Sequence, residues 1–236
     1  MSKKREAWED ELWSYINTGN GIGCPQFDSC TLKANKDIRC FNDESERDTV
    51  SLINNFVDND DIDVIDDMQF DMQPRCLLRG RVFELVTKLT QKYLSNNWNN
   101  TLPVSDNLIS EDRHNHPIEV CYLYLKANHG AVWRLPDCWM IYINKRDTPA
   151  RQRFTLYHEV FHILAHSHGK AVFKKTRDAH VYFNEVLADH FAANILVPGE
   201  VLKQKWASIG DINQISELFD VPKPIMYIAL ASKGLI

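Results

Sequence analysis

The stretch RFTLYHEVFHILAH, residues 153–166, decides how this chain is interpreted. It carries His158 and His162 four positions apart, with Glu159 directly after the first of them. Residues four apart on an α-helix stand one turn apart on the same face, so both imidazoles can reach one ion. In such a motif the imidazoles bind zinc and the glutamate removes a proton from water. The alternative is a buried helix whose histidines are satisfied by hydrogen bonds, since most other residues of the stretch are apolar.

A third ligand separates these interpretations, because a catalytic zinc takes three protein ligands and leaves one position for water. His168 has the spacing of the extended His-Glu-x-x-His-x-x-Gly-x-x-His motif, but Ala165 occupies the position of the glycine that turns the chain. Glu185 lies in NEVLADHFAANILVP, on the next predicted helix, and completes a set of two histidines and one glutamate. Asp189 follows four residues later on the same face, where it can accept a hydrogen bond from a ligand histidine. Glu185 is therefore favoured over His168.

The composition is that of a globular protein, since 44% of the 236 residues are apolar. The net charge of −5 is unevenly spread, because residues 1–75 hold 17 acidic and 8 basic side chains. We expect an acidic N-terminal appendage, residues 1–75, followed by a metallopeptidase domain, residues 76–236. The sequence has neither the apolar run of a signal peptide nor a transmembrane segment, so a cytoplasmic protein without membrane contact is expected.

Three of the six cysteines, Cys24, Cys30 and Cys40, fall within 17 positions in the N-terminal part. Cysteines of a cytoplasmic protein are usually free thiols or metal ligands. These three could hold a second, structural zinc. Their five and nine intervening residues do not fit the usual spacing of zinc knuckles, however, and the sequence offers no clear fourth ligand. Free thiols are the favoured interpretation.

The periodicity of apolar residues predicts an α+β fold. It places helices over residues 5–17, 81–98, 154–166, 183–196, 212–219 and 225–233. Between them, short runs of β-branched and aromatic residues predict an antiparallel β-meander packed on the active-site helices: IEVCYLYLK (118–126), AVWRL (131–135) and WMIYIN (139–144). If WMIYIN lies at the sheet edge, an extended peptide could add to it as a further strand, whereas an interior strand has no free edge.

With these motifs the chain resembles the ImmA/IrrE family of zinc metallopeptidases. The resemblance covers residues 118–236 and rests on RQRFTLYHEVFHILAHSHG, NEVLADHFAANILVP and ISELFDVPKPIMYIALASKGLI. It implies a zincin-like fold and a cytoplasmic endopeptidase whose substrate is a helix-turn-helix transcriptional repressor. It also implies one zinc bound by His158, His162 and Glu185, with Glu159 as the catalytic base.

Two features depart from the pattern of that family. Phe161 stands before the second histidine, where the family commonly has glycine, and residues 1–75 have no recognisable counterpart. The first departure concerns the shape of the cleft and the second the choice of partner. Two alternatives to peptide cleavage are left open. The chain could be a metal-containing anti-repressor that sequesters a repressor without cutting it, or a metal-dependent hydrolase of another substrate.

Two further assignments are weaker. The group that stabilises the oxyanion is left open among four residues, each more often structural than catalytic: Tyr157, His180, Tyr182 and His190. The segment from residue 209 onward could form a helix-turn-helix, but its acidic side chains outnumber its basic ones. Because DNA binding needs a basic surface, we expect this segment to pack on the peptidase core and not to bind nucleic acid.

Overall fold

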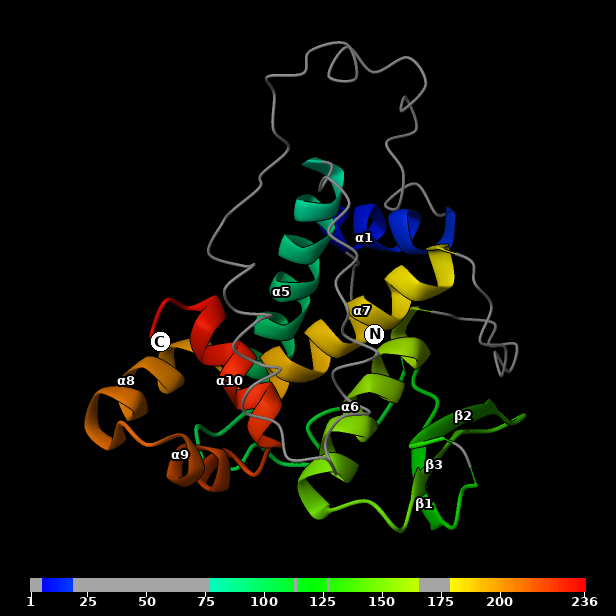
Figure 1. Ribbon diagram of the computed structural model, residues 1–236. Helices are drawn as coiled ribbons and strands as arrows, with labels where there is room; N and C mark the ends of the chain where they lie inside the picture. The colour runs from blue at the N-terminus through cyan, green and yellow to red at the C-terminus, as the bar shows by residue number, and fades with distance from the viewer. Residues whose placement is uncertain (1–5, 19–76, 113, 127, 166–178) are drawn as a thin grey trace. The chain divides into compact units, whose positions relative to one another are not determined.

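The computed structural model describes residues 6–18, 77–112, 114–126, 128–165 and 179–236 (Figure 1). The chain divides into two compact units, Met1–Val86 and Thr87–Ile236. Most of the expected acidic appendage lies outside the described residues, as do the three clustered cysteines and His168. The boundary at residue 75 and the second metal site therefore stay predictions. None of the described helices is long and apolar enough to cross a membrane.

The described residues form seven helices and three strands, so the α+β class is confirmed for this part of the chain. The sequence placed most of these elements within a few residues, but it missed α8. The helices are α1 (Ala7–Thr18), α5 (Leu77–Asn97), α6 (Pro149–Ala165), α7 (Ala179–Leu196), α8 (Gly199–Ile209), α9 (Ile212–Phe219) and α10 (Lys223–Ser232). The strands are β1 (Ile118–Leu123), β2 (Gly130–Arg134) and β3 (Trp139–Asn144).

In the first unit, α1 buries one face and exposes the other. Leu12, Trp13 and Ile16 recur at helical spacing and are nearly inaccessible to solvent. On the exposed side, Arg81 of α5 donates two hydrogen bonds of 3.1 Å to the Glu11 carboxylate. Exposed ion pairs contribute little to stability, so the apolar face is the main support of this helix.

The sheet has the strand order β1-β3-β2, with β3 in the middle. β3 pairs in parallel with β1 and antiparallel with β2, so the predicted antiparallel meander is wrong. The physical reason is burial, because Trp139, Ile141 and Ile143 of β3 are at most 1% exposed and need neighbours on both sides. Turn residues mark where the chain reverses, but not which strands become neighbours.

The central place of β3 also decides the question of a free edge. WMIYIN is an interior strand, so no peptide can add to it. Within the described part of the chain, β2 pairs only with β3 and is thus one of the two edge strands. Gly130 and Val132 of β2 stand opposite Ile143 and Ile141 on the same face of the sheet. α6 packs against β2 and β3, so this edge lies beside the helix that carries the histidine motif.

α6 and α7 form the centre of the second unit and pack against each other (Figure 1). Thr148 begins α6, because its Oγ1 accepts a hydrogen bond of 3.3 Å from the backbone N–H of Arg151. On α7, Ala188 and Ala192 are fully buried. Small residues allow two helix axes to approach closely, which is what a site shared between the helices requires.

The last three helices complete the second unit. The Asp211 side chain caps α9 by accepting a hydrogen bond of 2.8 Å from the N–H of Gln214. α9 then ends at Asp220, whose φ of 50° stops the helix in the left-handed region. Ile215, Phe219 and Leu230 are fully buried, as expected if this segment packs on the rest of the unit.

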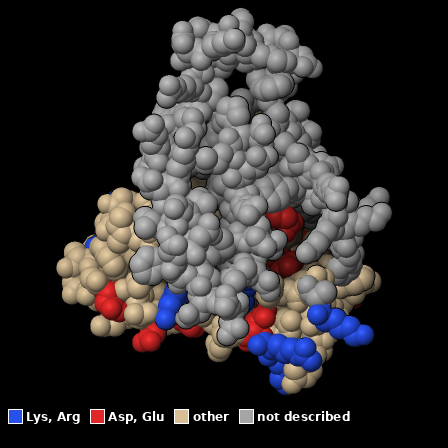
Figure 2. Space-filling view, viewed as in Figure 1, with Lys and Arg blue, Asp and Glu red and all other residues tan. Residues whose placement is uncertain are grey.

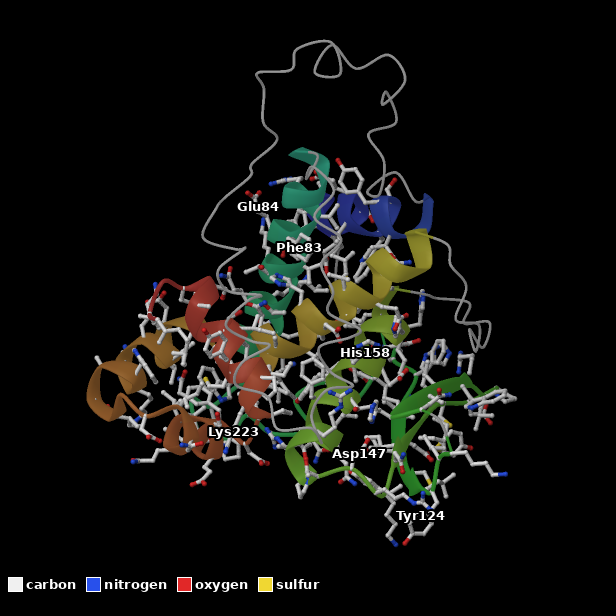
Figure 3. All side chains as sticks on the ribbon, in the orientation of Figure 1. Phe83, Glu84, Tyr124, Asp147, His158 and Lys223 are labelled. Atoms are coloured by element: carbon white, nitrogen blue, oxygen red, sulfur yellow. The ribbon has the colours of Figure 1, made fainter. Side chains whose placement is uncertain are left out.

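The exposed end of the sheet carries basic side chains. Tyr124, which follows β1, is 69% exposed. Lys145 and Arg146, which follow β3, each place their charged group 5.7 Å from the centre of its ring. Figure 2 shows Lys and Arg gathered in this region, at the lower right, where Figure 3 labels Tyr124. Contacts of this kind hold the cations over the ring.

Candidate metal centre

The histidines of the motif converge as their spacing predicts. His158 projects from α6 (Figure 3), and its Nε2 lies 3.2 Å from the Nε2 of His162, one turn further along the helix. Both rings are mostly enclosed, since 17% and 16% of the two side chains are exposed. Two ring nitrogens at this separation can offer their lone pairs to a single ion.

α7 supplies a carboxylate to the same point. The Oε2 of Glu185 lies 3.1 Å from the Nε2 of His158, and its Oε1 lies 3.3 Å from the Nε2 of His162. The ligand atoms of these three residues all lie within 4.8 Å of one another, and no other such group of three occurs among the described residues. The expected grouping of the three side chains is thus present.

The ligand atoms are close enough to share one ion. Ligands about 2.0–2.1 Å from a tetrahedral zinc ion stand about 3.3 Å apart. The two Nε2 atoms are 3.2 Å apart, and each lies 3.1 or 3.3 Å from a different oxygen of the Glu185 carboxylate. Two imidazoles with one carboxylate are also a usual donor set of a catalytic zinc site. The residues present therefore fit a metal in both geometry and chemistry.

Asp189 holds His158 from the other side. Its Oδ1 lies 2.7 Å from the Nδ1 of His158, where it accepts a hydrogen bond and leaves Nε2 turned toward Glu185. Burial by itself lowers the pKa of His158, but the hydrogen bonds to Asp189 and Glu185 and their charges outweigh it and raise the pKa well above its usual value. His158 meets Asp189 and His162 meets Glu185, so α6 and α7 run antiparallel, as the sequence indicated.

Glu159 is enclosed beside this cluster. Only 9% of the residue is exposed, and burial raises the pKa of its carboxyl, although the charges of His158 and His162 act in the opposite direction. A raised pKa brings a carboxyl nearer to the working pH, which suits a group that first accepts a proton and then returns it. For Glu185 the balance is reversed, because its hydrogen bonds to the two histidines outweigh burial and lower its pKa.

The candidates for an oxyanion donor have other partners where they are described. Tyr157 is fully buried and its hydroxyl donates to the carbonyl of Ser105. The Nε2 of His190 lies 2.9 Å from the Oγ1 of Thr87. The side chains of His180 and Tyr182 lie outside the described residues. Tyr157 and His190 therefore have structural roles here.

Phe161 does not enter the site. It is fully buried, and its ring centre lies 5.4 Å from that of Phe191 of α7 in a tilted contact and 6.2 Å from that of His162 in an edge-to-face contact. The bulky residue before the second histidine thus fills the core between the two helices.

Sequence reasoning missed Gly130, the first residue of β2. A Cβ at this position would lie 2.7 Å from the Oε1 of Glu159, so the strand passes directly against this carboxylate. In the sequence, Gly130 ends Asn-His-Gly between two predicted strands, a pattern that is typical of a turn and does not point to a catalytic site.

Comparison with known proteins supports the interpretation of the motifs. A family model described as IrrE N-terminal-like domain (Peptidase_M78) matches residues 113–230, half of the chain. The matched residues include the whole cluster on α6 and α7 together with all three strands. A search of curated proteins found no match.

Proposed function

This chain belongs to the ImmA/IrrE family of metallopeptidases, and we propose that it is a zinc-dependent endopeptidase that holds its metal with His158, His162 and Glu185. The observation that carries this proposal is the convergence of these three side chains beside the buried Glu159. When bound, zinc polarises a scissile carbonyl and makes water acidic enough to lose a proton near neutral pH. The roles of the individual residues below are part of the proposal.

Glu159 acts as the general base. Its carboxylate takes a proton from the attacking water and then delivers it to the leaving amine, so that it ends the cycle ionised. Its burial directly beside the proposed ligand atoms supports this role. Asp189 keeps the proton of His158 on Nδ1 and thereby keeps Nε2 free as a ligand atom. His162 and Glu185 provide the other two ligand atoms.

The substrate is proposed to bind in an extended conformation along β2. Among the described strands β2 pairs with β3 alone, and its first residue lies against Glu159. A peptide that adds to this edge gains backbone hydrogen bonds along its length. It would pass beside the base, where its carbonyl carbon can meet the attacking water. The role considered for WMIYIN if it were an edge strand is thus proposed for its neighbour β2.

A peptidase acts on protein, and we propose that this protein substrate is a helix-turn-helix transcriptional repressor in the cytoplasm. Support for this narrower choice comes from the resemblance of residues 118–236 to the ImmA/IrrE family.

The test compares wild type with Glu159→Gln, which keeps the shape of the side chain but removes the base. A co-purified partner is incubated with each protein, and its fragments are identified by mass spectrometry. We expect wild type to cut the partner and the variant to retain both zinc and partner binding while cleavage falls by about 10²–10⁴-fold. If both proteins relieve repression equally and neither produces fragments, the chain sequesters its partner and is not an endopeptidase for it.

A further inference from the structure

Gly130 is the point at which the sheet meets the proposed catalytic base. It starts β2, pairs with Ile143 and faces α6. A Cβ added at Gly130 would lie 2.5 Å from the Cγ2 of Thr155, 2.7 Å from the Oε1 of Glu159 and 3.1 Å from its Cγ. Real Cβ atoms essentially never approach other heavy atoms closer than 3.0 Å. A larger residue at this position would therefore force the strand or the side chains of Thr155 and Glu159 to shift.

The contact is made with both the stem and the head of the glutamate. The strand backbone is close to the Cγ as well as to a carboxylate oxygen, so it limits how the Glu159 side chain can rotate. Thr155 lies one turn earlier on the same face of α6, and its Cγ2 also lies close to the strand. Only 9% of Glu159 is exposed, so most of its surface lies against other parts of the protein.

Other described glycines do not have this environment. A Cβ at Gly80 would meet nothing within 4 Å, and one at Gly199 would first meet the Cε of the flexible Lys233 at 3.2 Å. Gly210 has an open surrounding and a φ of 62°, so its glycine is explained by backbone conformation. Gly130 is instead explained by the close approach of the Thr155 and Glu159 side chains.

We propose that Gly130 is a positioning residue, whose missing side chain lets edge strand β2 hold the Glu159 carboxylate at the distance that a peptide bound on β2 requires. This inference rests on the proposed function for the identity of the base. β2 then has two tasks, since the edge that faces away from β3 aligns the substrate and the face that packs on α6 fixes the group that acts on that substrate. An added methyl group must displace the strand or the carboxylate, and either change separates the two.

The contact itself is tested in metal-free protein, without any substrate. Thermal midpoints are measured for wild type, Gly130→Ala, Glu159→Ala and the double variant. We expect Gly130→Ala to lower the midpoint by about 2–10 °C in wild type and by clearly less in the Glu159→Ala background, where the Cγ and the carboxylate are missing. An equal loss in both backgrounds would show that the added methyl does not meet Glu159 and would overturn the proposal.

The catalytic role is tested in the zinc-loaded protein. Gly130→Ala is combined with Thr155→Ser, which removes the Cγ2 atom and so relieves the other collision. We expect this double variant to fold and to keep one zinc per chain, while kcat for the partner falls by about 10–100-fold and KM changes little. Gly80→Ala, which adds the same methyl group in open space, is the matched control and should keep the wild-type kcat.

The outcomes distinguish a failure of the role proposed for Gly130 from a failure of the proposed endopeptidase function. If kcat of the double variant returns to the wild-type value, the only conflict was with Thr155 and Gly130 is merely a packing residue. Loss of zinc from the double variant would show that the methyl disturbs the ligands and not the base. If wild-type cleavage does not depend on Glu159, the proposed function fails, while the thermal cycle still decides whether Gly130 fixes the Glu159 side chain.

Discussion

Two histidine–aspartate pairs in this molecule have similar contacts but different surroundings. In the pair on α6 and α7, the Nδ1 of His158 lies 2.7 Å from an Asp189 oxygen. In the loop before β1, the Nδ1 of His116 lies 3.1 Å from the Oδ2 of Asp112. Taken alone, either pair could orient an imidazole for binding a metal.

The two pairs differ in the further contacts that the histidine and the aspartate make. The Nε2 of His158 faces a second imidazole and a carboxylate, and so becomes part of a group of three ligand atoms. Asp112 instead accepts hydrogen bonds from the indole Nε1 of Trp139 at 2.8 Å and from the backbone N–H groups of His114 and His116. Its oxygens are used to close a loop over a buried tryptophan. A histidine–aspartate pair is therefore a common unit, and the groups around it determine its use.

The largest expected effect is the loss of metal. Alanine at His158, His162 or Glu185 should reduce the zinc content from one ion per chain to nearly none, because each removes one of three ligand atoms. His116→Ala, the control from the other pair, should keep its zinc. Metal analysis of the purified proteins checks this. If Glu185→Ala kept its zinc and His168→Ala lost it, the third ligand would be His168 and not Glu185.

A smaller effect is expected from the aspartates. Asp189→Asn should weaken zinc binding by about 10–100-fold, because an amide orients the ligand imidazole less strongly than a carboxylate does. Asp112→Asn should leave zinc affinity unchanged. Competition with a chelator of known affinity measures both. Equal affinities in wild type and Asp189→Asn would show that the hydrogen bond to His158 does not tune the site.

For the stability of the fold, the larger effect is expected at Asp112. Asp112→Asn should lower the free energy of unfolding by about 1–3 kcal/mol at neutral pH, since an amide cannot accept all the hydrogen bonds that the carboxylate receives. Burial raises the pKa of Asp112, but hydrogen bonds from Trp139 and the backbone outweigh it and lower the pKa below its usual value of 3.8. A lowered pKa stabilises the folded state above the unfolded value and loses this effect as the pH falls through the folded one.

The difference between wild type and Asp112→Asn should therefore shrink as the pH falls below about 4. Urea unfolding between pH 3 and pH 7 measures it. A difference that stays constant over this range would mean that the charge of Asp112 plays no part.

The smallest effect is expected at a third pair. The Nδ1 of His129 lies 2.9 Å from the Oδ2 of Asp147, but 38% of this histidine side chain is exposed. Solvent screens such a pair, so His129→Gln should change the free energy of unfolding by less than about 1 kcal/mol and leave the zinc content unchanged. A larger loss of stability, measured by urea unfolding, would show that this pair stabilises the fold as strongly as the hydrogen bonds of Asp112 do.

The grouping of His158, His162 and Glu185 could be predicted because its information is local. Four-residue spacings put His158 above His162 and Glu185 above Asp189, and one antiparallel contact between two helices brings these faces together. The sheet order could not be predicted in this way, because it depends on which strand needs cover on both sides. α8 was missed because, of its eleven residues, only Leu202 is buried, which leaves little periodic signal.

The role proposed for Gly130 could not be predicted from local sequence either. Its importance depends on an atom of Glu159, 29 positions away in the sequence, and no local pattern around a turn contains that distance. Residues that act by being small are visible only once the neighbouring surfaces are in place.

The uneven cover of the three ligand side chains has a kinetic consequence. Glu185 is 48% exposed, whereas the two histidine side chains are 17% and 16% exposed. On the proposed ligand set, the exposed carboxylate would be the ligand that a competing chelator reaches first, whereas the enclosed imidazoles would be reached last. Metal exchange should therefore be a reaction of second order, whose rate rises with the concentration of the competing chelator.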